Sequence, residues 1–178
     1  MQPRVVVLVE GASDRAALHE LARRRDHDLA AAGVAVVAMG GVTNVGHHAR
    51  RWAGEQVRLG GLCDAREASW FTRALGVVPT PQAEHGVGVC VEDLEDELIR
   101  ALGVAAVEDV IARDGELGSL RTLRRQPAQR ERPPAAHLHR FLGTRSGRKE
   151  RYARLLTAAL PLDAVPPVLD AVLTHALS

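Results

Sequence analysis

Four short apolar runs, separated by segments with a helical pattern, constrain the fold of this chain more than any other feature of its sequence. The first run, Val5–Val9, contains four valines and a leucine without a polar interruption. A strand that is apolar at every position is buried on both faces, as in a parallel sheet. Further runs lie at residues 34–39, 57–63 and 87–91. The alternation predicts right-handed βαβ units and a mainly parallel sheet of about four strands, covered by helices on both faces.

The pattern changes after residue 113. Strand signals stop there, and three prolines between residues 127 and 134 interrupt an arginine-rich stretch that is typical of a loop. We therefore expect an α/β core over residues 1–113 and a basic, mainly helical extension over residues 114–178 that packs on this core. The expected helices cover residues 13–25, 45–54, 66–75, 93–102, 104–113, 137–142, 148–160 and 167–177.

Length, cysteine content and the N-terminus restrict the class of protein. A chain of 178 residues suits one compact domain with a small appendage and is too short for two full domains. Its longest apolar run is far shorter than the ~20 residues of a membrane span, and no secretory signal is recognisable. Cys63 and Cys90 are the only cysteines, too few for a disulfide framework or a zinc cluster. We expect a cytoplasmic protein that does not interact with membranes.

The net charge of +1 hides an uneven distribution of charge. Residues 113–154 carry 12 basic and 4 acidic side chains, a net charge of +8, whereas the rest of the chain carries 11 and 18, a net charge of −7. Arginines can hold a polyanion, and carboxylates can hold a divalent cation. Aromatic residues make up 3% of the chain, which disfavours the stacking platforms of single-strand binders.

Acidic residues follow two of the predicted strands at the point where each strand ends. Glu10 and Asp14 come directly after the first strand, and Asp64 follows the third. Because the carboxyl ends of parallel strands meet at one edge of the sheet, we expect these carboxylates to share a site. Carboxylate oxygens suit Mg²⁺. The ordinary alternative is a pair of strand-end turns, in which Ser13 caps one helix and Asp64 forms a capping box with Glu67.

A third acidic cluster follows the fourth strand. Five of the six residues from 92 to 97 are carboxylates, and the helix macrodipole accounts for one or two of them. The others repel one another at this sheet edge unless a cation neutralises them. Lys149, in a basic helix start at residues 147–153, can stabilise negative charge on a phosphodiester, although a solvated basic helix face is the more common case. The five carboxylates are Glu92, Asp93, Glu95, Asp96 and Glu97.

Several common site motifs are missing from the sequence. It contains no P-loop, no G-x-G-x-x-G after the first strand and no G-x-S-x-G, which disfavours P-loop nucleotide binding, dinucleotide binding and α/β-hydrolase chemistry. The histidine pairs at residues 47–48 and at His137 and His139 lack cysteine partners at zinc-site spacing. We expect them to be surface or loop histidines.

These acidic motifs resemble those of a Toprim domain, which has a Rossmann-like fold. Glu10 and Asp14, in Val9-Glu10-Gly11-x-x-Asp14, match the family's first motif, and Asp64 matches the first position of its Asp-x-Asp motif. The chain is most similar to the Toprim nuclease domain of the OLD (overcoming lysogenization defect) endonucleases. That branch adds an acid in a Leu-Glu motif, matched by Leu94-Glu95, and a later basic residue, for which Lys149 is the best match. The resemblance spans roughly residues 5–160.

Two departures from the family pattern stand out. Arg66 occupies the second aspartate position of Asp-x-Asp, with Glu67 next to it, so one metal position is either lost or supplied by Glu67. OLD endonucleases also carry an ATPase before the Toprim part, and the present sequence has none. We therefore expect a stand-alone protein or one whose ATPase is a separate chain.

The resemblance implies a metal-dependent DNA endonuclease or nickase, with Mg²⁺ or Mn²⁺ in a two-metal site. It assigns catalysis to Glu10, Asp64 and Lys149, and allows a homodimer. It assigns the contacts with the DNA backbone, which carry little sequence preference, to the basic segment. The metal ligands it implies are Glu10, Asp14, Asp64 and Glu67 for one ion, and Glu95 and Glu97 for the second. The expected DNA-binding residues are Arg121, Arg124, Arg125, Arg145, Arg148 and Arg151.

Three other functions are compatible with the sequence. The first is a non-catalytic nucleic-acid-binding or regulatory module with a degenerate metal site, which the Arg66 replacement favours. The second is a phosphotransfer enzyme that acts on small phosphoesters. The third is a receiver-like α/β domain that only binds a partner. Cleavage of DNA, cleavage of a small ester and binding without turnover discriminate among them.

Overall fold

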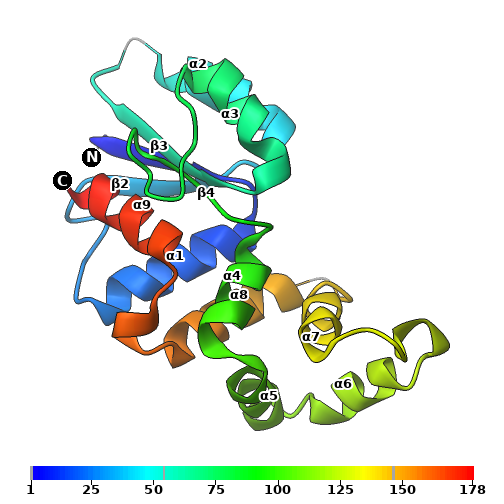
Figure 1. Cartoon of the computed structure of the whole chain (residues 1–178). Helices are drawn as coiled ribbons and strands as arrows, with labels where there is room; N and C mark the ends of the chain where they lie inside the picture. Colours follow the sequence, from blue (N-terminus) through cyan, green and yellow to red (C-terminus); the bar gives the residue numbers. More distant parts are fainter. Residues whose placement is uncertain (1, 54, 146) are drawn as a thin grey trace.

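The computed structural model describes residues 2–53, 55–145 and 147–178 (Figure 1). Four parallel strands form one sheet in the order β2-β1-β3-β4, which confirms the predicted four-stranded parallel sheet. The strands cover Val5–Val9 (β1), Val34–Ala38 (β2), Arg58–Cys63 (β3) and Val87–Val89 (β4).

Helices follow each strand, and further helices occupy most of the C-terminal half. The first three lie between strands, and α4 begins shortly after β4. The helices are α1 (Ala12–Arg24), α2 (Val45–Trp52), α3 (Ala68–Leu75), α4 (Leu94–Leu102), α5 (Val104–Arg113), α6 (Leu117–Arg124), α7 (Pro134–Leu142), α8 (Arg148–Ala159) and α9 (Pro167–Leu177). In the described part of the chain, no helix is both long and apolar enough to span a membrane.

The continuous apolar run of β1 is buried on both faces of the sheet. Val5, Val7 and Val9 face a core that includes side chains of α1, α8 and α9, whereas Val6 and Leu8 face a smaller core that Phe71 of α3 helps to form. Figure 1 shows α2 and α3 on one side of the sheet and α1 and α9 on the other. All five β1 residues are at most 2% exposed, as the apolar pattern predicts.

Two glycines, one in the inner strand β3 and one in the edge strand β4, permit a close approach of helices to the sheet. A Cβ atom on Gly61 of β3 would lie 2.5 Å from the Phe71 ring of α3, and one on Gly88 of β4 would lie 2.6 Å from Val172 of α9. Glycine weakens a strand signal in the sequence, but here it makes room for packing. The helix α9 therefore lies directly on the sheet, and α8 packs along α1.

The two chain ends lie at the amino edge of the sheet. The chain enters β1 at Val5, and the C-terminal part of α9 reaches Gly86, just before β4, where a Cβ atom would lie 2.6 Å from the ring of His175. Figure 1 places the N- and C-termini next to each other, away from α4 and α7. The carboxyl edge, where the acidic motifs lie, is at the opposite end of the strands.

The helix α6 corrects the loop that we expected in the arginine-rich stretch. Its leucines Leu117, Leu120 and Leu123 recur every three residues, a helical spacing that the sequence interpretation missed among the arginines and prolines. The prolines mark a short 3₁₀ turn, Pro127–Gln129, and the start of α7. The division of the chain at residue 113 remains a prediction. Helices α8 and α9, which come after this position, share one core with β1 and α1.

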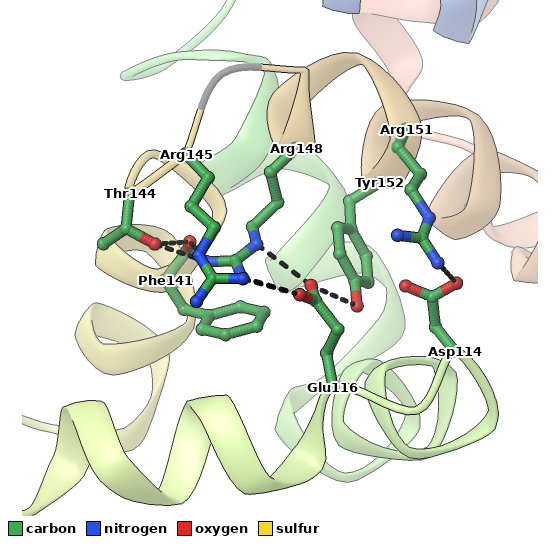
Figure 2. A network of polar contacts seen from close by, with 8 residues as sticks. All are labelled: Asp114, Glu116, Phe141, Thr144, Arg145, Arg148, Arg151 and Tyr152. Carbon is green, nitrogen blue, oxygen red and sulfur yellow. Dashed lines mark hydrogen bonds and ion pairs between the residues drawn. The ribbon is translucent and has the colours of Figure 1, made fainter.

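A buried arginine ties α8 to the start of α6 (Figure 2). The guanidinium of Arg148 donates two hydrogen bonds to the carboxylate of Glu116, at 2.7 and 3.0 Å, and one to the carbonyl of Phe141 at 3.2 Å. It also lies 4.1 Å from the centre of the Phe141 ring and donates to the Thr144 hydroxyl. The hydroxyl of buried Tyr152 donates to Glu116 at 3.3 Å. Arg148 is 6% exposed, so this network is part of the interior.

Candidate metal centre

The site lies where the two central strands end. Val9 of β1 is paired with Leu62 of β3, and Glu10 and Asp64 follow these strands closely. The helix after β1 covers one face of the sheet, and the helix after β3 covers the other. In open α/β sheets, the point where the chain changes face is the usual position of a binding crevice. Glu10 and Asp64 therefore stand at the switch point of this sheet.

Glu10, Asp64 and Glu67 form the first carboxylate cluster. Each contributes an oxygen, and these oxygens lie within 4.8 Å of one another. Asp64 precedes the short 3₁₀ helix Ala65–Glu67, but its side chain accepts no capping hydrogen bond, so the capping-box alternative is not what the structure shows. Oε2 of Glu67 is buried without a hydrogen-bond partner. The cluster thus has a buried carboxylate oxygen that no protein donor satisfies.

Asp14 adds a buried carboxylate beside this cluster. It lies in the first turn of α1, and its Oδ2 accepts the backbone N–H of Gly11 at 2.9 Å. The helix begins at Ala12 with Gly11 at the N-cap, so Ser13 does not cap it as expected. Asp14, Glu10 and Asp64 line one cavity of about 450 Å³.

Three carboxyl groups of this site have raised pKa values. Burial, together with the neighbouring carboxylates Asp14 and Asp93, raises the pKa of Asp64 to about 8. Burial is also the main cause that raises the pKa of Asp14 to about 7 and that of Glu67 to about 7. Carboxylates that are buried together repel one another, and a divalent cation removes this repulsion. The unsatisfied oxygen of Glu67, the negative charge and the all-oxygen donor set fit Mg²⁺ or Mn²⁺.

Lys149 and Glu95 line the same cavity from the opposite side. Lys149, at the start of α8, donates from Nζ to Oε2 of Glu95 at 3.0 Å. Burial opposes the charge of Lys149, but the ion pair with Glu95 and the nearby carboxylates Asp93 and Asp64 together outweigh this effect and raise the pKa of the lysine. Oε1 of Glu95 is buried without a partner. The predicted association of Glu10, Asp64, Glu95 and Lys149 around one cavity is therefore present in the structure.

The other acids of residues 92–97 have separate contacts. Glu92 is exposed, and Asp96 pairs with Arg100. Asp93 caps α4, since its Oδ1 accepts the N–H of Asp96 at 2.9 Å. Glu97 was expected to bind metal, but one of its oxygens accepts the N–H of Val91 at 2.8 Å and the other pairs with Arg100 at 2.8 Å. The structure therefore gives Glu97 a structural role at the start of α4.

A second cavity of about 460 Å³ adjoins the first and shares Asp64 with it. Arg66, at the position of the missing aspartate, is 91% exposed at this cavity and lies 3.9 Å from Glu92. Helix α7 contributes His139 and Arg140, and the segment before it contributes Arg132. The sequence interpretation missed Arg132 and Arg140 and took His139 for a surface or loop histidine, whereas it lies in helix α7 beside Asp93. No motif indicates them, because they reach the site only through the packing of α7 against α4.

The arginines expected to bind DNA have different environments. Arg148 is buried in the network of Figure 2, which gives it a structural role instead. Arg124 pairs with Glu108, and Arg151 pairs with Asp114. The remaining three of this group, Arg121, Arg125 and Arg145, are exposed. Arg145 is 67% exposed, and its guanidinium lies 3.7 Å from the carboxylate of Glu116.

Comparison with known proteins identifies the fold and part of the sequence. Residues 4–59 match the family described as "Overcoming lysogenization defect protein-like, TOPRIM domain". Two solved structures are similar over nearly the whole chain. The C-terminal region of the Burkholderia pseudomallei OLD protein has a TM-score of 0.67 and 19% identity, covering 99% of this chain and 98% of that one. The C-terminal region of the Xanthomonas campestris pv. campestris OLD protein has a TM-score of 0.65 and 23% identity, covering 98% and 95%. No curated protein matches the sequence.

Proposed function

We propose that this chain, which has the Toprim fold of OLD C-terminal regions and matches the OLD-like Toprim family over residues 4–59, hydrolyses phosphodiester bonds of DNA with divalent metal ions. The observation that carries the proposal is the set of converging carboxylates at the switch point of the sheet, some partly and some fully buried, with one lysine on the same cavity. Such a set combines ligands for a divalent cation with a positive group for a phosphate.

Each side chain has a defined part in this proposal. Glu10, Asp14, Asp64 and Glu67 would hold a divalent ion, and Glu95 would contribute to a second. Divalent cations in such sites lower the pKa of an attacking water and neutralise charge on the phosphate. Lys149, held by Glu95 at 3.0 Å, would place its ammonium against the scissile phosphate as negative charge develops.

Conversion of supercoiled plasmid to nicked and linear forms tests the proposal. Wild type should nick DNA with Mg²⁺ or Mn²⁺, and Glu10→Ala should not. Lys149→Ala should reduce the rate by about 100-fold, which is the usual effect of losing one donor that stabilises transition-state charge. Arg113→Ala, which removes an exposed positive charge elsewhere, should leave the rate unchanged. Gel-shift assays would show whether each variant still binds DNA.

A negative result would separate the alternatives. DNA binding without cleavage by wild type, with any metal, would contradict the nuclease proposal and favour the binding module that the Arg66 replacement suggests. Cleavage of a small phosphodiester but not of DNA would favour a phosphotransfer enzyme. Cleavage that appears only when an ATPase chain is added would support the separate-partner hypothesis. A homodimer is tested by the molecular mass in solution.

The exposed arginines at the second cavity are the best candidates for backbone contacts. We expect Arg132→Ser/Arg140→Ser to weaken DNA binding at low salt and to reduce the slope of log affinity against log salt by about two, because two phosphate contacts are lost. The matched comparison is Arg121→Ser/Arg125→Ser, which removes the same charge from α6 and the residue after it. A larger effect of the second pair would place the DNA over α6 instead.

A further inference from the structure

We propose that Asp93, Glu95 and His139 form a second, chemically different metal position, which takes a divalent first-row transition metal such as Mn²⁺ in preference to Mg²⁺. The position lies between α4 and α7, next to the carboxylate cluster of Glu10, Asp64 and Glu67. The inference names the ligands of the second ion to which the proposed function assigns Glu95, and it rests on the proposed function in that respect, although metal binding is measured without cleavage.

The geometry brings three ligands of two types, two carboxylates and one imidazole, together from two helices. One donor atom from each of Asp93, Glu95 and His139 lies within 4.8 Å of the others. Asp93 and Glu95 are the N-cap and a first-turn residue of α4, and His139 is in the last turn of α7. Nε2 of His139 lies 2.6 Å from Oδ2 of Asp93. Oδ1 of Asp93 is the oxygen that caps the helix, so Oδ2 of Asp93 and Nε2 of His139 can face a common ion.

A buried oxygen without a partner is the independent sign of a missing ligand. Glu95 is only 4% exposed, and Lys149 satisfies one of its two oxygens. The other, Oε1, has no hydrogen-bond partner. A buried carboxylate oxygen without a donor is costly, and a cation at this position would remove the cost. The unsatisfied oxygen belongs to one of the three residues whose donor atoms converge.

The nitrogen ligand sets the preference for the metal. Mg²⁺ binds oxygen ligands almost exclusively, whereas imidazole nitrogen favours transition metals. The cluster of Glu10, Asp64 and Glu67 offers only carboxylates. The chain would therefore carry two neighbouring positions with different donor sets, one suited to Mg²⁺ and one suited to a metal that accepts a histidine.

Pulsed electron paramagnetic resonance of bound Mn²⁺ tests this directly, because a coordinated imidazole gives a nitrogen modulation. The full chain with Mn²⁺ should show this modulation, and a Mg²⁺ excess of about 100-fold should not remove it, because Mg²⁺ takes oxygen ligands and coordinates imidazole poorly. His139→Gln should abolish it and weaken one Mn²⁺ site by at least about tenfold, since even groups that only support metal ligands are worth 10–100-fold in affinity. His27→Gln, which changes an exposed histidine elsewhere, should retain the signal.

Two outcomes would overturn the inference. One is the absence of nitrogen modulation in wild type, which would leave His139 and Asp93 as a salt bridge only. The other is modulation that persists in His139→Gln, provided that circular dichroism shows a folded variant. Because metal binding is measured without DNA, nicking by a protein that lacks the modulation would reject this inference and retain the nuclease. If the protein shows the nitrogen modulation but does not nick DNA, this inference is retained and the nuclease proposal is rejected.

Discussion

Replacement of Asp64 with asparagine is expected to make the metal-free protein more heat-stable at about pH 8 and, at the same time, to reduce DNA nicking by at least about 1,000-fold. Under the proposed function, the loss of activity follows because a divalent metal held by Asp64 would contribute several kcal/mol of charge stabilisation, and each 1.36 kcal/mol is tenfold in rate. The gain in stability follows because asparagine keeps the shape of Asp64 but removes a charge that Asp14, Asp93, Glu67 and Glu10 repel.

The pH dependence separates this effect from an ordinary core substitution. The pKa of Asp64 is about 8 in the folded chain, and the pKa values of Asp14 and Glu67 are about 7, all above their ordinary values near 4. Between about pH 4 and about pH 8, these three carboxyl groups bind more protons in the folded state than in the unfolded state. Their contribution to the free energy of unfolding therefore falls as the pH rises through this range. In a chelator, the melting temperature of Asp64→Asn should therefore exceed that of wild type most at the upper end of this range.

Thermal unfolding in EDTA at about pH 5.5 and about pH 8, followed by addition of Mg²⁺ or Mn²⁺, measures both parts of this prediction. The metal should stabilise wild type far more than Asp64→Asn. Asp163→Asn, an exposed acid outside the site, is the matched control and should behave as wild type. If Asp64→Asn lowers the melting temperature at the higher pH, the repulsion argument is wrong.

Glu116→Ala is expected to destabilise the protein by about 3–5 kcal/mol, the usual cost of leaving one partner of a buried ion pair without its counter-charge. The substitution removes both hydrogen bonds from the Arg148 guanidinium to a carboxylate and the acceptor of the Tyr152 hydroxyl. Arg148 would keep its contacts with Phe141 and Thr144, which are neutral groups. Chemical denaturation followed by circular dichroism measures the free energy of unfolding.

Two further variants make this prediction specific. Glu116→Leu/Arg148→Met removes both charges and should recover much of the loss, because apolar residues often replace a buried ion pair without cost. Glu131→Ala removes an exposed acid and should change stability little. The hydrogen bonds from Arg148 lower the pKa of Glu116, so its contribution should be present above its ordinary pKa of 4.5 and lost as pH falls through the lower folded value. A cost below about 1 kcal/mol for Glu116→Ala would place the pair among weak surface salt bridges.

The sequence was sufficient to predict the sheet and the residues at its edge. Val5–Val9 can be buried only between two layers of helices, and parallel strands then place Glu10 and Asp64 at the same edge of the sheet. Strand direction gives this common edge, whereas the pairing of β1 with β3, which makes the two residues neighbours, is shown by the structure. The fold assignment relied on the same motifs, and the family match over residues 4–59 confirms it for that part.

The sequence could not show which polar side chains have structural contacts and which line the candidate site. Glu95 and Glu97 are equally acidic in the sequence, but only the N–H of Val91 and the nearby Arg100 show that Glu97 is already satisfied. Arg148 has the same charge as its exposed neighbours, and its burial depends on Glu116 and Phe141, which are distant in sequence or on another helix. His139 reaches Asp93 across 46 residues of sequence. Such pairings depend on how helices pack and leave no periodic signal.

The position of both chain ends has a practical consequence for experiments with single molecules. Because β1 begins and α9 finishes at the amino edge of the sheet, a tether or fluorophore attached to either end lies at the far end of the strands from the carboxylates. A surface-anchored protein should therefore leave its acidic edge facing the solution. Dyes on the two ends would lie close together while the sheet is intact, so loss of energy transfer between them would report the release of α9.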